Sequence, residues 1–221
     1  HSTGGWAALV GAILLGSRTS KYTKDGKVNA IPGSSMPLAT LGTFILWLGW
    51  FGFNGGSQLA LGSLEDASSV SRIFMNTNLA AAGGVVVAMI LSQLFYGKVD
   101  LTFALNGALA GLVSITAEPL TPSPLWSIII GGIGGAIVVL TVPILDRLKI
   151  DDVVGAIPVH LIAGIWGTLA VPLTNPDGSF VTQAIGIAAI GAFVVVASAI
   201  VWMIRKMTIG IRPSEEAESD G

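Results

Sequence analysis

The sequence has no cysteine, only two histidines and few charged residues among its 221 positions. The absence of cysteine excludes disulfides, thiolate catalysis and metal sites built on cysteine. Charged residues make up 11% of the chain, whereas a soluble domain has about 25%. So few charged side chains cannot cover the surface of a water-soluble protein. No cluster of basic residues indicates a nucleic-acid partner. A polytopic membrane protein is the class that remains.

Apolar residues dominate what is present. They account for 52% of the chain, and 29 glycines accompany them, as expected of helices that pack closely in a membrane. Each apolar run approaches the ~20 residues with which a helix spans a bilayer, and none alternates like a barrel strand. The seven runs cover residues 1–16, 38–61, 72–96, 101–116, 125–145, 153–173 and 180–207. We therefore predict an all-α, polytopic transmembrane helical bundle over residues 1–207, followed by a tail at residues 208–221.

The first apolar run is too short to span a bilayer alone, and it begins at His1 without an initiator methionine. We therefore expect the sequence to be part of a longer protein, with this run as the inner part of a spanning helix.

The charged residues of the loops indicate an orientation. With seven spans, 10 of the 11 lysines and arginines fall on one side of the membrane, and Arg72 alone falls on the other. Such an excess marks the cytoplasmic side. We therefore expect a multi-pass protein of the cell membrane (plasma or inner membrane) with a cytoplasmic C-terminal tail.

His160 lies inside an apolar run, where an ionisable side chain is costly and commonly marks a pathway or proton relay. The alternative is a core histidine that donates to a neighbouring carbonyl. His1 and His160 are each followed by a glycine four residues later, at Gly5 and Gly164. Such a glycine leaves a gap on the same helix face, so the two helices could approach closely and bring the imidazoles together.

The residues before His160 predict how its helix begins. Asp151 and Asp152 are placed to cap free backbone N–H groups at the helix start. Pro158 has no N–H and deprives Val154 of a helical partner, which loosens the first turns. Irregular backbone of this kind is tolerated in a membrane where it lines a cavity.

The second apolar run interleaves glycines with aromatic residues, among them Trp47, Trp50, Phe51 and Phe53. This pattern fits an aromatic constriction or cation-π site facing a pore. It equally fits an aromatic belt combined with close helix packing. The pattern alone does not decide between them.

Several long motifs resemble the ammonium transporter (Amt/Mep) family, which is related to Rh proteins. The strongest are Trp50-Phe-Gly-Phe-Asn-Gly-Gly-Ser57 and the segment 151–160 ending in His160; segments 74–77 and 106–117 also match. The resemblance covers essentially the whole chain in order. It implies an eleven-helix protomer with its own pore, assembled as a homotrimer, of which these seven spans form the C-terminal portion.

The resemblance also implies roles for five residues. His1 and His160 correspond to the first and second pore histidines, Phe53 to the inner phenylalanine closing the outer vestibule, and Ser57 to the serine that helps recruit ammonium there. Trp50 lies in the same motif and is assigned to the pore wall. The family's outer phenylalanine, its recruiting tryptophan and an aspartate before the first histidine are not in this sequence. Glu118-Pro119 and Leu161 also depart from the family pattern.

The expected function is transport of ammonium or ammonia, with methylammonium as an analogue, through a hydrophobic pore with a twin-histidine centre. The alternative is an ammonium-sensing, transporter-like domain of a membrane signalling protein. An enzyme is not expected, since the sequence has no HExxH or GxSxG motif and no paired intramembrane aspartates. We expect no cofactor and no metal, because two histidines without a carboxylate make a poor metal site.

The tail changes from basic to acidic along residues 205–221. Its residues predict a cytoplasmic anchor followed by a solvated acidic end. The family resemblance implies instead that the tail packs under the bundle and couples subunits. It also implies that a PII-type signalling protein can block the pore from this side.

Overall fold

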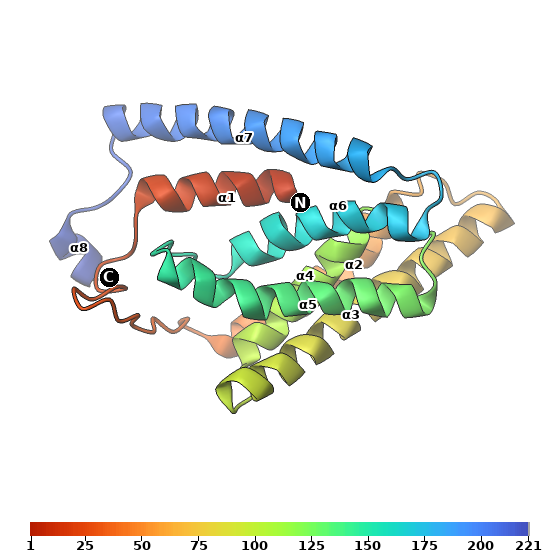
Figure 1. Cartoon of the computed structure of the whole chain (residues 1–221), viewed down its shortest axis with the longest axis horizontal. Helices are drawn as coiled ribbons and strands as arrows, with labels where there is room; N and C mark the ends of the chain where they lie inside the picture. The colour runs from red at the N-terminus through yellow and green to blue at the C-terminus, as the bar shows by residue number, and fades with distance from the viewer. Residues whose placement is uncertain (221) are drawn as a thin grey trace.

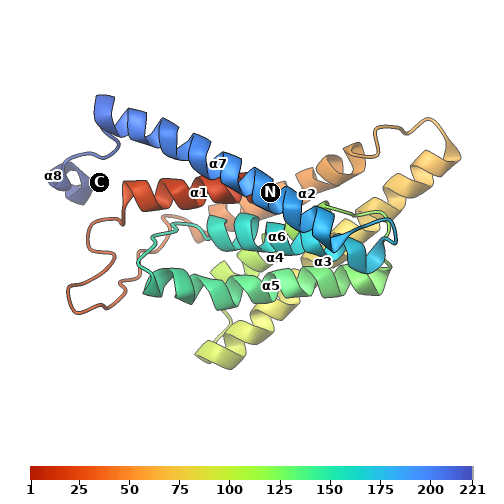
Figure 2. The same ribbon diagram turned by 45° about the horizontal axis from the view of Figure 1, so that its top comes forward.

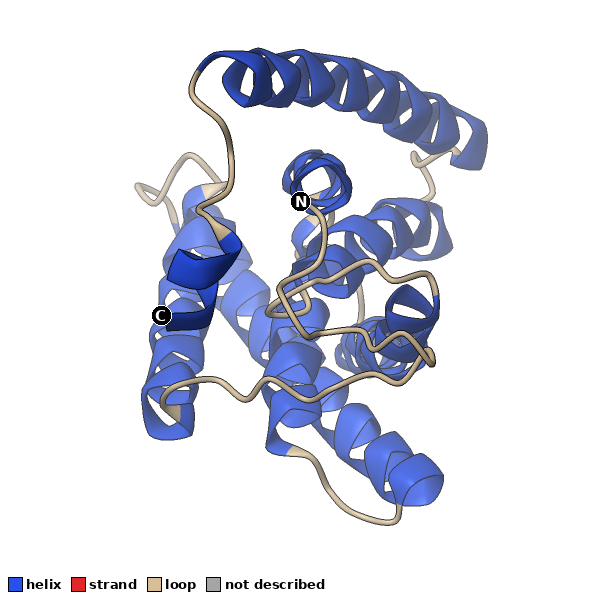
Figure 3. Cartoon of the chain, turned by 90° about the vertical axis from the view of Figure 1, so that its left-hand side faces the viewer, coloured by secondary structure: helices blue, strands red, loops and turns tan. Residues whose placement is uncertain are grey.

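The computed structural model describes residues 1–220, and these fold into helices joined by loops (Figures 1 and 3). Within residues 1–220 the only β pairing is the isolated bridge between Tyr22 and Val28. The prediction of an all-α fold is therefore confirmed. The helices are α1 (Ser2–Leu15), α2 (Met36–Gly56), α3 (Leu64–Tyr96), α4 (Leu101–Thr116), α5 (Pro124–Arg147), the π-helix η1 (Ile157–Ile162), α6 (Ala163–Thr174), α7 (Phe180–Thr208) and α8 (Glu215–Asp220).

Each of the seven predicted spans corresponds to a helix, but the helices fall into two length classes. Five are long and apolar enough to cross a membrane: α2, α3, α5, α7 and the continuous segment formed by η1 and α6. The other two, α1 and α4, have 14 and 16 residues and are shorter than the ~20 residues of a typical span.

Some predicted boundaries are wrong, because polar capping residues extend or delay the helices. Helix α3 begins at Leu64 rather than at residue 72, because the Ser63 hydroxyl accepts a hydrogen bond from the amide of Asp66 and starts the helix two turns earlier. Helix α2 ends at Gly56 rather than at residue 61. The sixth helical segment begins at Ile157 rather than at residue 153, and it begins as a π-helix.

The buried centre of the molecule is formed by α3, α4 and α5, which pack on one another along their lengths. Their backbones approach very closely: a Cβ added to Gly84 of α3 would overlap the carbonyl of Gly107 of α4. Helix α7 lies on the outside, over α1 and α6 (Figures 1 and 2). Of its 29 residues only Gly191 and Val194 are buried.

The acidic end of the chain forms helix α8 and binds the loop between α1 and α2 (Figure 1). Glu218 is paired with Arg212 and also accepts a hydrogen bond from the amide of Thr19 at 2.8 Å. Arg212 in turn donates to the carbonyl of Leu15 at the end of α1, at 3.3 Å. Residues 215–217 are exposed, as predicted for a solvated acidic end, and the contacts of Glu218 additionally hold this end against the first loop.

Candidate pore site

The two histidines lie side by side where the start of α1 packs against η1. The ring centroids of His1 and His160 are 5.5 Å apart, and the ring planes are inclined by 27°. The predicted role of the two glycines explains this contact. A Cβ on Gly5 would overlap the backbone of Leu161, and a Cβ on Gly164 would lie 3.3 Å from the Cβ of His1.

The π-helix that carries His160 is started by the side chain of Asp152. Its carboxylate accepts hydrogen bonds from the amides of Gly155 and Ala156 at 3.0 Å each, and from the amide of Ile157 at 2.7 Å. Gly155 has a φ of 81°, a conformation that glycine adopts at little cost. Pro158 in the first turn supplies no N–H. The predicted loosening of these turns therefore takes the form of a π-helix.

Asp151 does not cap the helix, contrary to the prediction. Its carboxylate pairs instead with Arg18 of the first loop, accepting from Nε and from the backbone amide on one oxygen and from Nη2 on the other, at 2.8–2.9 Å. The Asp151 side chain is 1% exposed. The hydrogen bonds from Arg18 lower the pKa of Asp151, and they raise the pKa of Arg18.

A cavity of about 400 Å³ lies beside the two imidazoles and is otherwise apolar. The stacked rings of His1 and Trp50 are 5.1 Å apart, and Phe53 is 5.8 Å from His1. Four of the five predicted site residues are thus brought together. The lining residues are His1, Ile45, Leu46, Gly49, Trp50, Phe53 and His160.

The fifth predicted residue, Ser57, does not line this cavity. It is the exposed C-cap of α2, one helical turn beyond Phe53, and its hydroxyl donates to the Phe53 carbonyl at 3.0 Å. The other aromatic residues of α2 also lie away from the histidines: Phe51 packs on Phe74 of α3, and Trp47 packs against the buried core. The aromatic residues of this helix therefore divide between cavity wall and helix packing.

The sequence interpretation missed the residues that hold α2 in place. The Trp50 indole N–H donates to the Thr116 hydroxyl at 2.8 Å, and the buried Asn54 amide donates to Thr77 at 3.0 Å. Polar residues within apolar runs were the signal that could have revealed these pairs. The partners of such residues depend on the packing of α2 against α3 and α4, which the sequence does not show.

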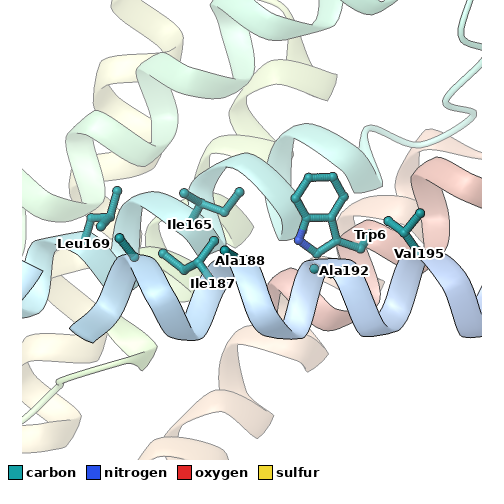
Figure 4. Close-up of a pocket in the computed structure, with 9 residues that line it drawn as sticks. Trp6, Ile165, Leu169, Ile187, Ala188, Ala192 and Val195 are labelled. Carbon is teal, nitrogen blue, oxygen red and sulfur yellow. The ribbon is translucent and has the colours of Figure 1, made fainter. Parts of the chain in front are cut away.

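A second cavity, of about 450 Å³, lies between α1, α6 and α7 (Figure 4). Its lining is apolar apart from the indole nitrogen of Trp6, which has no hydrogen-bond partner. Among the described residues, no group of three His, Cys, Asp or Glu side chains could hold a metal ion. In the cavity beside α2, the side chains of His1 and His160 are the only ionisable groups of the lining.

Comparison with known proteins gives a consistent result. The model of the Ammonium Transporter Family matches residues 1–221. Ammonium transporter Amt2 of Archaeoglobus fulgidus is 48% identical over 81% of this chain and 37% of its own length. Ammonium transporter Amt1 of Haloferax mediterranei is 39% identical over 100% of this chain and 45% of its own length. The chain thus spans less than half the length of these two relatives.

Solved structures of related proteins have the same fold. A structure named Sensor Amt Protein aligns with a TM-score of 0.93 and 36% identity, over 100% of this chain and 56% of the other. Mep2 of Candida albicans aligns with a TM-score of 0.84 and 27% identity, over 98% of this chain and 51% of the other. The helical architecture agrees with the family match and with the two relatives. The chain therefore belongs to the ammonium transporter family.

Proposed function

We propose that this protein moves ammonium across a membrane as ammonia, through a pore whose centre is the His1–His160 pair. The observation that carries the proposal is the contact of these two imidazoles, 5.5 Å apart, at the wall of an otherwise apolar cavity. The names of the two relatives, both ammonium transporters, support the same substrate.

The cavity favours ammonia over ammonium. An ion that enters an apolar space loses its hydration without compensation, whereas a small neutral molecule loses much less. Ammonium therefore gives up one proton before it passes, and ammonia crosses. Each imidazole has one nitrogen that donates and one that accepts when neutral, so the pair can bind ammonia and relay the released proton.

The aromatic residues of α2 form the outer part of this path. Phe53 is 59% exposed and lies beside His1, and Ser57 lies one turn further along α2. In this proposal Ser57 helps to recruit ammonium, Phe53 closes the entrance, and Trp50 forms the wall beside His1. These roles follow the family resemblance, and the positions along α2 support their order.

The assembly and orientation are also part of the proposal. The C-terminal tail lies on the cytoplasmic side with 10 of the 11 basic residues, and a PII-type signalling protein would bind that face. A homotrimer would cover apolar side chains such as Leu41 and Leu48, which are 53% and 71% exposed on α2. Lipid would cover the remaining apolar surface.

The substrate can be tested in cells that lack their own ammonium transporters. Cells that express the complete protein should take up labelled methylammonium, and added ammonium should compete with this uptake. Cells that neither grow on low ammonium nor take up methylammonium would contradict the proposal. A sensing domain without transport is the alternative. The two relatives named as transporters support transport over this alternative. One similar solved structure carries the name of a sensor.

A further inference from the structure

The indole of Trp50 has one polar atom, and a residue of another helix binds it. The indole N–H donates to the hydroxyl of Thr116, the last residue of α4, at 2.8 Å. The Thr116 hydroxyl donates in turn to the carbonyl of Leu112 at 2.6 Å. Because the single hydroxyl proton points to Leu112, an oxygen lone pair is left for the indole. The two hydrogen bonds therefore have a fixed direction, from α2 to the backbone of α4.

The ring held by this bond is a wall of the cavity. Trp50 is 7% exposed, and its ring lies within 20° of parallel to the ring of His1. Its other neighbour in the cavity is Phe53, with 5.9 Å between ring centroids. Rotation about the side-chain bonds of Trp50 would move the ring relative to His1, and the bond from the indole N–H opposes that rotation. The bond to Thr116 thus sets how far the ring projects towards the histidines.

A second buried bond fixes the helix that carries Trp50. Asn54 follows Trp50 by four residues, on the same face of α2, and it is 1% exposed. Its amide donates to Thr77 of α3 at 3.0 Å. Rotation of α2 about its axis is therefore restrained independently, so that loss of the bond to Thr116 releases the Trp50 ring rather than the whole helix.

We propose that Thr116 is a positioning residue of the transport site. It holds Trp50 parallel to His1 and thereby sets the width of the cavity, which favours ammonia over its N-methylated analogue. This inference rests on the proposed function. An indole N–H without a partner in an apolar environment is unfavourable, so a released ring turns towards another acceptor. The wall then yields to the extra methyl group of methylamine.

The test measures transport by the complete protein in liposomes, with ammonium and methylammonium as substrates. Thr116→Val keeps the shape of the side chain and removes the hydroxyl, whereas Thr116→Ser retains it. We expect Thr116→Val to lower the preference for ammonium roughly fivefold, a part of the ~10-fold or greater discrimination that an apolar pocket achieves against one extra carbon. The change should lie mainly in the ratio of the two KM values. Thr116→Ser should keep the preference of the unmodified protein.

Thr168 of α6 provides a matched control. Its hydroxyl donates to the carbonyl of Gly164 at 2.9 Å, the same bond to the fourth preceding residue that Thr116 makes. No indole is bonded to it in the part of the chain that the structure describes. Thr168→Val therefore removes an equivalent hydroxyl and should leave the substrate preference unchanged.

An independent readout follows the indole itself. In protein labelled with ¹⁵N in its indoles, the Trp50 signal can be identified by its loss in Trp50→Phe. It should shift in Thr116→Val and stay in place in Thr116→Ser and Thr168→Val. In the Trp50→Phe background, Thr116→Val should change the preference no further, because both residues act through one contact.

Three results would overturn the inference. The first is a Thr116→Val protein whose indole signal shifts while its substrate preference does not, since the hydroxyl would then be only structural. The second is an additive effect in the double variant. The third is an unchanged preference in Trp50→Phe, which decides the matter even if Thr116→Val does not fold. If the unmodified protein transports no ammonium, the proposed function itself fails. If the unmodified protein transports ammonium normally, any of the three results refutes the role of Thr116 and leaves the proposed function intact.

Discussion

Gly5 of α1 lies directly against the backbone of Leu161 in η1, with no room for a methyl group between them. Across the same contact, Gly164 faces the start of α1, where an added Cβ would lie 3.0 Å from the amide nitrogen of Ser2. Each histidine thus approaches the other because a glycine on its own helix admits the opposite backbone. The contact between the imidazoles depends on these glycines as much as on the histidines.

Gly5→Ala should separate α1 from η1 and reduce transport. Because the new methyl group would overlap backbone rather than a movable side chain, we expect a loss of stability of about 1–3 kcal/mol, as for other overpacked sites. Thermal unfolding of the complete protein in detergent and methylammonium uptake would measure the two effects. Gly4→Ala is the matched control, because a Cβ on Gly4 meets nothing within 4 Å. Equal behaviour of the two variants would contradict the prediction.

Asp152→Ala should destabilise the start of η1. The substitution leaves three backbone amides without the acceptor that they have now, and loss of a helix N-cap costs about 1 kcal/mol. The melting temperature in detergent should fall, and exchange of the Gly155, Ala156 and Ile157 amides should accelerate. Asp177→Ala removes an exposed carboxylate from a different loop and should leave both quantities unchanged. Normal protection of the three amides in Asp152→Ala would show that the carboxylate does not start the helix.

The pair of Arg18 and Asp151 should make stability depend on acid pH. Because the pKa of Asp151 is lowered in the folded protein, its contribution is fully present above the ordinary aspartate pKa of about 3.9. It is lost as the pH falls through the lowered value. Asp151→Asn should remove this dependence and cost about 2 kcal/mol, the worth of hydrogen bonds to a charged group. Unfolding measured from pH 7 down to pH 3 tests this. Asp25→Asn, which changes an exposed carboxylate in the loop that carries Arg18, is the control.

Glu218→Gln should release the tail from the first loop. Arg212 and the amide of Thr19 lower the pKa of Glu218 to about 2, so the carboxylate stays charged and the contact persists until the pH falls to that range. In the variant, hydrogen exchange at the Thr19 amide should accelerate at neutral pH. Glu216→Gln removes a neighbouring exposed charge from α8 and should not affect Thr19. Protection of Thr19 that is equal in both variants would contradict the contact.

The sequence was sufficient for features that depend on local pattern. The seven apolar runs each correspond to a helical segment, and five of these segments are long enough to cross a membrane. The spacing from His1 to Gly5 and from His160 to Gly164 indicated that the two histidines could meet. The sequence was insufficient where a residue acts through a distant partner. Asp151 resembled a helix cap, but its carboxylate accepts its hydrogen bonds from Arg18. Arg18 lies 133 residues earlier in the sequence, so no local pattern indicated this pair. Thr116 likewise gave no sign of the indole of Trp50 until α2 and α4 were packed together.

The most direct test of the twin-histidine pore is charge-coupled uptake by His160→Ala in the complete protein. Liposomes on a sensor that records current would receive an ammonium or methylammonium gradient, with the unmodified protein measured in parallel. Without the second imidazole the proton released from ammonium has no relay, so we predict that both the current and the charge-coupled methylammonium uptake disappear in His160→Ala. Unchanged uptake and unchanged current in a folded His160→Ala protein would contradict the central claim.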